Sequence, residues 1–148
     1  MKKNKHSVII NIFNTVPLPV SKKYIRAVVK KILLHSNCSD NEVSFLFCGN
    51  AEIKKYNRKY LQTNRCTDVI AFYDDSKLPG YQKKYLGDII VSAEQAKIQA
   101  KQLKHSNKKE LITLIIHGIL HLLGYKDTSK SLKKKMFNRQ EKILKKIS

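Results

Sequence analysis

The segment that most constrains the fold is the stretch of residues 107–123, which is apolar on almost every side of a helix. Its aliphatic side chains leave no polar stripe along that segment: Leu111, Ile112, Leu114, Ile115, Ile116, Ile119, Leu120, Leu122 and Leu123. A helix without a polar face belongs in the interior of a domain, so we expect this one at the centre. Asn107 is the expected N-cap, Glu110 lies in the first turn, and Gly124 follows the helix.

Shorter patterns on both sides of this segment predict the other elements. Runs rich in β-branched and aromatic residues predict strands over residues 7–13, 43–48, 68–73 and 86–91. Helical periodicity predicts helices after the N-cap Ser21 and over residues 51–61, 93–103 and 131–147, with Ser92 and Gln95 forming a capping box. A polar loop is expected over residues 74–85. The 148 residues are the length of one domain.

The order of these elements is β-α-β-α-β-β-α-α-α, which indicates an α+β fold. We expect a single domain over residues 1–148, with one small mixed sheet of about four strands packed against about five helices. The candidate metal site described below would lie on the central apolar helix.

Composition limits the location and the partners of the chain. It has no run near the roughly 18 apolar residues of a membrane-spanning helix, and Asn11 and Asn14 interrupt the stretch after the basic N-terminus, so we expect a cytoplasmic protein without a signal peptide. Cys38, Cys48 and Cys66 form no CxxC pair, which favours reduced thiols. A net charge of +19 favours a polyanionic partner, nucleic acid first, although a genome-wide lysine bias would give the same charge.

The central helix carries two histidines, His117 and His121, four residues apart and therefore on one face. Two imidazoles in so apolar a segment need hydrogen-bond partners or a metal ion, and for the pair alone both readings are equally good. Asp127 follows a short reversal and is the only acid between Glu110 and Glu141. Two imidazoles and one carboxylate, with a position left for water, are the ligands of a catalytic zinc site. Other divalent metals accept the same set. Asp127 taken alone is more typical of a turn residue or of the N-cap of the last helix, and it is the three residues together that favour a metal.

The residue after the first histidine excludes a common class of enzyme. Zinc proteases of the HExxH type carry their general base at that position, where this chain has Gly118. We expect this glycine to open space beside the site for a bulky substrate group.

Residues 117–127 (HGILHLLGYKD) resemble the signature HGxLHLxGYDH of the YbeY family. Residues 57–72 (NRKYLQTNRCTDVIAF) and 86–96 (LGDIIVSAEQA) are similar, in the same order, to two further blocks of that family. Its members are bacterial metal-dependent endoribonucleases that act in small-subunit rRNA maturation and ribosome quality control. The resemblance implies a single-strand-specific endoribonuclease acting in 16S rRNA 3′ end maturation. It also implies one Zn²⁺ ion at His117, His121 and Asp127, which would be both ligands and catalytic residues. The implied partners are rRNA and the small ribosomal subunit, with ribosomal proteins or an assembly GTPase as further candidates and no membrane.

Three positions depart from the family pattern. Asp127 stands where the third ligand is usually histidine, and its negative charge should reduce the Lewis acidity of the metal. Leu61 stands at the family's active-site arginine, with Arg58 and Arg65 close by in the sequence. Cys66 replaces a proline, which should alter only the stiffness of that turn.

Other residues are expected to support the site. We expect Arg58, Arg65, Lys126 and Lys130 to hold RNA phosphates. Thr67, Asp68 and Asp88, at the ends of predicted strands, are expected to orient the histidines, with turn capping as an equal alternative.

The segment from residue 130 to 148 has eight lysines or arginines and one acid, Glu141. As a helix it would present a basic face that follows an RNA backbone, unless this is an ordinary solvated face.

The hypothesis is metal-assisted cleavage of an RNA phosphodiester, in which the ion polarises a phosphoryl oxygen and activates a water or orients the attack. Two other classes stay open. One is a metal-dependent hydrolase of another bond, against which Gly118 argues. The other is a non-catalytic ribosome-assembly factor with a structural metal, which Leu61 and Asp127 favour.

Overall fold

The computed structural model describes residues 8–38, 41–61, 67–74 and 84–147. The elements follow in the predicted order: β1 (Ile9–Asn14), α1 (Lys22–His35), β2 (Asn41–Cys48), α2 (Asn50–Leu61), β3 (Val69–Tyr73), β4 (Lys84–Ser92), α3 (Ala93–Gln102), α4 (Asn107–Leu122) and α5 (Lys130–Ile147). They form one α+β domain with a four-stranded sheet, which confirms the predicted fold class. Among the described helices, none is long and apolar enough to cross a membrane.

The sheet is mixed, with the strand order β1-β2-β4-β3. The strands β1, β2 and β4 run parallel, whereas β3 pairs antiparallel with β4 and forms one edge. Gly87 lies opposite Tyr73 in this last pair, with a φ of 142°. A Cβ atom there would lie 2.0 Å from the carbonyl oxygen of Phe72, so only glycine allows the two strands to approach this closely.

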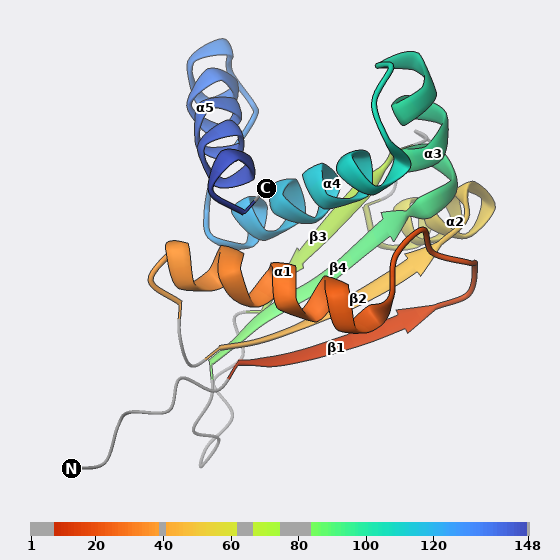
Figure 1. Cartoon of the computed structure of the whole chain (residues 1–148), viewed down its shortest axis with the longest axis horizontal. Helices are drawn as coiled ribbons and strands as arrows, with labels where there is room; N and C mark the ends of the chain where they lie inside the picture. The colour runs from red at the N-terminus through yellow and green to blue at the C-terminus, as the bar shows by residue number, and fades with distance from the viewer. Residues whose placement is uncertain (1–7, 39–40, 62–66, 75–83, 148) are drawn as a thin grey trace.

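The helices α1 and α4 cross the same face of the sheet (Figure 1). Phe45 and Ile89 point from the sheet into this layer, and Ile115, Ile116 and Ile119 of α4 meet them with no exposed surface. The apolar helix is therefore central, as its sequence predicts.

Gly118 faces the sheet and not the site. A Cβ atom at this position would lie 2.7 Å from Cγ2 of Ile89 and 3.2 Å from Cγ2 of Val69. The glycine lets α4 lie close against β3 and β4. The expectation that it opens space for a substrate group is wrong, because the missing side chain would point into the core.

The opposite face of the sheet is only partly covered. Ile53 of α2 packs there against Cys48, Ile70 and Ile90. Phe13 of β1 lies on the same face but is not covered by α2, and it is 62% exposed. Cys38 and Cys48 are free thiols, as expected, while Cys66 lies outside the described residues.

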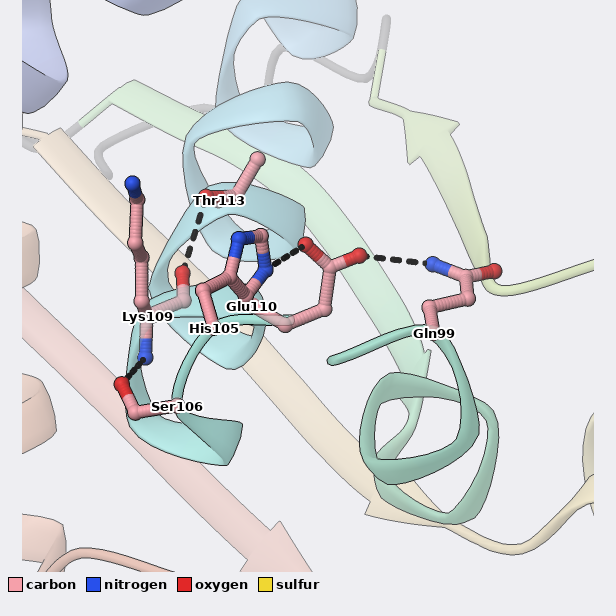
Figure 2. A network of polar contacts seen from close by, with 6 residues as sticks. All are labelled: Gln99, His105, Ser106, Lys109, Glu110 and Thr113. Carbon is pink, nitrogen blue, oxygen red and sulfur yellow. Dashed lines mark hydrogen bonds and ion pairs between the residues drawn. The ribbon is translucent and has the colours of Figure 1, made fainter. Parts of the chain in front are cut away.

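Polar contacts anchor the first turn of α4. The hydroxyl of Ser106 accepts a hydrogen bond from the backbone N–H of Lys109, so Ser106 is the N-cap and the expected cap, Asn107, is the first helical residue. The buried carboxylate of Glu110 accepts a hydrogen bond from Gln99 of α3 and contacts His105 Nε2 at 3.1 Å (Figure 2). These contacts join α3 to the start of the helix that carries the histidines.

Candidate metal centre

The last two turns of α4 place the two predicted histidines against each other. The Nε2 atoms of His117 and His121 are 3.0 Å apart, and the two rings meet edge to face with centroids 4.6 Å apart. Both side chains are half-buried, so the pair lies between the core and the solvent. The spacing of four residues therefore produces the shared face that the sequence predicts.

The turn after α4 orients His121. Gly124 has a φ of 101°, and the backbone N–H of Tyr125 donates to the carbonyl of Leu120 at 3.0 Å, which is a Schellman-type helix end. This turn places the carbonyl of Tyr125 at 3.1 Å from Nδ1 of His121. A carbonyl oxygen only accepts hydrogen bonds, so Nδ1 carries the proton and Nε2 of the neutral ring has a free lone pair.

A residue that the sequence analysis missed orients His117. Gln140 is buried at 8% exposure on α5, and its Oε1 lies 3.1 Å from Nδ1 of His117. The amide oxygen fixes the same tautomer as in His121. One signal in the sequence points to it, since Gln140 lies between Met136 and Ile143 on the buried stripe of α5, where a polar side chain needs a partner.

Two unprotonated nitrogens 3.0 Å apart repel unless a cation lies between them. Oδ2 of Asp127 lies 3.7 Å from Nε2 of His121, and the three candidate ligand atoms lie within 4.8 Å of one another. Two nitrogen ligands of one tetrahedral Zn²⁺ ion are roughly 3.3 Å apart, given bonds of about 2.0–2.1 Å. The donors of His117, His121 and Asp127 therefore fit one small divalent ion.

Burial lowers the pKa of His117, because a buried imidazolium loses hydration, and the neighbouring His121 lowers it further. The hydrogen bond that His117 donates to Gln140 and the carboxylates of Asp68 and Asp127 act in the opposite direction. The net shift favours the neutral imidazole, which is the form that binds a metal.

A cleft of about 820 Å³ opens beside His121. It is lined by the end of α4, one side of α2 and the edge strand β3. Thr67 and Lys126, two of the predicted site residues, line it, and so does Leu61. The hydroxyl of Thr67 also donates to the carbonyl of Val69 at 3.3 Å, which is the turn contact considered as its alternative role.

The other predicted RNA-binding residues either do not line this cleft or cannot be placed. Arg58 is exposed on α2 but is absent from the cleft lining, and Lys130 is exposed at the first position of α5. Arg65 lies outside the described residues.

The predicted supporting aspartates lie on different sides of the sheet. Asp68 is near enough to His117 for its carboxylate to oppose the lowering of the pKa of His117, and its role in orienting the histidine stays a prediction. Asp88 precedes Ile89, whose side chain faces α4, so Asp88 points to the opposite face, where it accepts a hydrogen bond from Tyr85. The expectation that Asp88 orients the histidines does not hold in this arrangement.

The basic face expected for the last segment is present on α5. Met136, Gln140 and Ile143 point inward, while all seven lysines of α5 are exposed. Lys126 and Lys135 border a smaller hollow between the end of α4 and α5. Lys126 also lines the cleft beside His121, which we call the metal cleft, so basic groups extend from α5 to this cleft.

Comparisons with known proteins agree with this picture. A family model described as Endoribonuclease YbeY matches residues 11–148. A protein of Persephonella marina named Endoribonuclease YbeY is 39% identical over 130 residues, covering 86% of this chain and 84% of the relative. A protein of the same name from a Sulfurihydrogenibium species is 34% identical over 148 residues, covering 99% of this chain and 96% of the relative. The solution structure of a Thermotoga maritima protein is similar, with a TM-score of 0.65 and 25% identity over 94% of this chain and 89% of that one.

Proposed function

The chain belongs to the YbeY family of endoribonucleases, and from that premise we propose that it cleaves single-stranded rRNA at a metal ion held by His117, His121 and Asp127. It is a hydrolase of RNA phosphodiester bonds, as the family name states. The metal dependence, the zinc ion and the ribosomal substrate are the parts of this proposal that need experimental tests.

One observation carries the metal-dependent mechanism. The Nε2 atoms of His117 and His121 face each other at 3.0 Å, while both Nδ1 atoms are held by oxygen acceptors. This arrangement leaves two lone pairs directed at one point, with a carboxylate oxygen of Asp127 nearby. Such a donor set is preorganised for a cation and is unfavourable without one.

Zn²⁺ in this donor set would supply Lewis-acid chemistry to a phosphodiester, with Asp127 making it a weaker acid than three neutral ligands would. The protein positions the substrate. Lys126 lines the cleft beside His121, where its ammonium group attracts a phosphate and balances developing negative charge. Leu61 lines the same cleft and cannot donate hydrogen bonds, so Lys126 has a larger share of this task than it would beside an arginine.

The preference for a single RNA strand rests on charge and shape. The open cleft accepts a single strand, and the exposed lysines of α5 offer contacts to a phosphate backbone without reading its sequence. The family to which the chain belongs, and not the geometry, suggests the natural substrate, and on that basis we propose the 3′ end region of 16S rRNA within the small ribosomal subunit. Ribosomal proteins or an assembly GTPase are proposed as neighbours, and the cytoplasm as the location.

The test is cleavage of single-stranded and double-stranded RNA of the same sequence, with and without a chelator, by the wild type and the His117→Ala variant. We expect the wild type to cleave the single strand and not the double strand. Both the chelator and the His117→Ala substitution should abolish this cleavage, and added Zn²⁺ should restore it in the wild type but not in the variant. Cleavage that survives chelation would contradict the metal-dependent mechanism. Bound metal without cleavage, in a preparation free of contaminating nucleases, would favour the non-catalytic assembly factor.

A further inference from the structure

Another hollow lies on the face of the sheet opposite the histidines. It has a volume of about 330 Å³ and is lined by Leu46, Tyr56, Tyr60, Phe72, Asp88 and Ile90. We call these six residues the aromatic groove. The ring of Tyr60 meets Phe72 edge to face at 5.5 Å and stacks on Tyr56 at 6.1 Å, yet Tyr60 is still 54% exposed. An exposed tyrosine held in place by two other rings has a fixed orientation and an open surface.

The aromatic groove and the metal cleft are both lined by residues of α2 and β3. Tyr56 and Tyr60 are one turn apart on α2 and line the groove, while the residues that follow each of them, Asn57 and Leu61, line the cleft. The edge strand β3 divides in the same way, since Phe72 faces the groove and Tyr73 lines the cleft. A strand of RNA that leaves the cleft across this edge reaches the groove directly.

The charges around the aromatic groove match a nucleic acid. Lys55 and Lys59 line an adjoining hollow together with Tyr56 and Glu52, whose carboxylate accepts a hydrogen bond from Thr15. The ammonium group of Lys59 lies 5.3 Å from the ring centroid of Tyr60. Such cations contact backbone phosphates while the aromatic rings stack on bases, which is the usual arrangement for single-stranded RNA. A purely apolar partner would instead bury the carboxylate of Asp88 with only the hydrogen bond from Tyr85 to compensate its lost hydration.

We propose that the aromatic groove binds an unpaired base of the same RNA strand that occupies the metal cleft. The base stacks on Tyr60, and its polar edge reaches the carboxylate of Asp88, whose orientation is held by the hydroxyl of Tyr85. A carboxylate accepts hydrogen bonds from the amino group of cytosine but repels the carbonyl oxygen that uracil has in the same place. The groove therefore favours cytosine over uracil. This inference rests on the proposed ribonuclease function and adds a binding site for a base beside the cleavage point.

The test measures binding of short fluorescent oligonucleotides of cytidine or uridine to the full-length protein, with a chelator present so that no cleavage occurs. Tyr60→Ala removes the stacking surface and should weaken binding of both about tenfold. Tyr60→Phe keeps the ring and should bind like the wild type. Phe13→Ala is the matched control, because it removes an exposed aromatic ring from the same face of the sheet outside the groove.

Asp88→Asn tests the contact with the base edge. The wild type should bind cytidine oligonucleotides several-fold more tightly than uridine ones, and this preference should fall to near unity in the variant. Equal loss of binding in Tyr60→Ala and Phe13→Ala, or no loss in either, would overturn the groove as a binding site. A preference that persists in Asp88→Asn would overturn the assignment of the carboxylate.

Cleavage of the same oligonucleotides with metal present separates this inference from the proposed function. If the wild type binds as expected but cleaves no RNA, the proposed function fails and the groove stands. If the wild type cleaves but Tyr60→Ala binds and cleaves like it, the groove fails and the proposed function stands.

Discussion

The Oε1 of Gln140 lies 3.1 Å from the Nδ1 of His117, and this contact joins the last helix of the chain to the metal centre on the central helix. The two faces of the helix α5 therefore have different roles. Its lysines face the solvent, and its buried stripe holds a ligand in position. Groups that hydrogen-bond a metal-binding histidine through its other nitrogen fix both the tautomer and the ring orientation.

Removing the amide of Gln140 should weaken metal binding. Gln140→Ala leaves Nδ1 of His117 without its acceptor, and we expect the affinity for Zn²⁺ to fall about 10- to 100-fold in competition with a chelating dye. Gln140→Glu keeps an acceptor and should retain the affinity. Asn138→Ala, an exposed position on the same helix, is the control. An unchanged affinity in Gln140→Ala would show that this contact does not orient His117.

Introducing the glutamate of the HExxH motif at position 118 should destabilise the protein and not convert it into a protease. The side chain in Gly118→Glu would enter the core between Ile89 and Val69, where the described structure offers no partner for a carboxylate. We expect urea unfolding to show a loss of about 3 kcal/mol or more. Gly118→Ala should lose less stability, because the better helix propensity of alanine, worth about 1 kcal/mol, offsets part of the clash of its Cβ atom with Ile89. A stable Gly118→Glu protein with peptidase activity would contradict the placement of residue 118.

An arginine at position 61 should improve cleavage. Leu61 lines the metal cleft at 52% exposure, so Leu61→Arg can direct a guanidinium group at a phosphate without disturbing the core. We expect kcat/KM for single-stranded RNA to rise about tenfold. Leu103→Arg adds the same charge at the exposed C-cap of α3 and should leave the rate unchanged. Equal effects of both substitutions would assign the gain to net charge alone.

Acid should destabilise the metal-free protein through His117. Burial lowers the pKa of His117 in the folded state, so below the ordinary value of about 6.5 the unfolded chain binds a proton that the folded chain does not. The free energy of unfolding then falls as the pH falls below that value, until His117 is protonated in the folded state as well. Urea unfolding in a chelator at about pH 7.5 and about pH 5 measures this loss. The loss should be smaller in His117→Gln, and an identical loss in both proteins would contradict it.

The order of the elements could be predicted because each has a strong local pattern. The first and last residues of each helix and strand were harder to predict, since they depend on contacts between elements. At the start of α3, Ser92 accepts a hydrogen bond from Gln95 N–H, as a capping box requires. The side chain of Gln95 does not return the contact, because its Oε1 accepts a hydrogen bond from the side-chain amide of Asn50 on α2. The backbone N–H of Ser92 instead donates to the backbone carbonyl of Asp68. Only one of the two hydrogen bonds of the predicted capping box is present, because tertiary contacts with other elements occupy the remaining groups.

The candidate ligands could be predicted because they lie within eleven residues of one another on one helix and the turn after it. Gln140 could not be assigned to His117 from spacing, since the contact spans 23 residues and depends on how α5 packs on α4. Asp88 was placed wrongly because β4 is apolar on both faces at Ile89 and Ile90. In such a strand, alternation does not indicate which face meets the central helix.

The most direct test of the proposed metal centre is the metal content of the purified wild type, His121→Ala and Asp127→Ala, measured by elemental analysis after dialysis against Zn²⁺. We predict one ion per chain in the wild type, none retained by His121→Ala, and strongly reduced retention by Asp127→Ala, since two imidazoles alone leave the site with too few protein ligands. Full retention of the ion by Asp127→Ala would contradict the three-residue site, and a metal-free wild type would contradict the account as a whole.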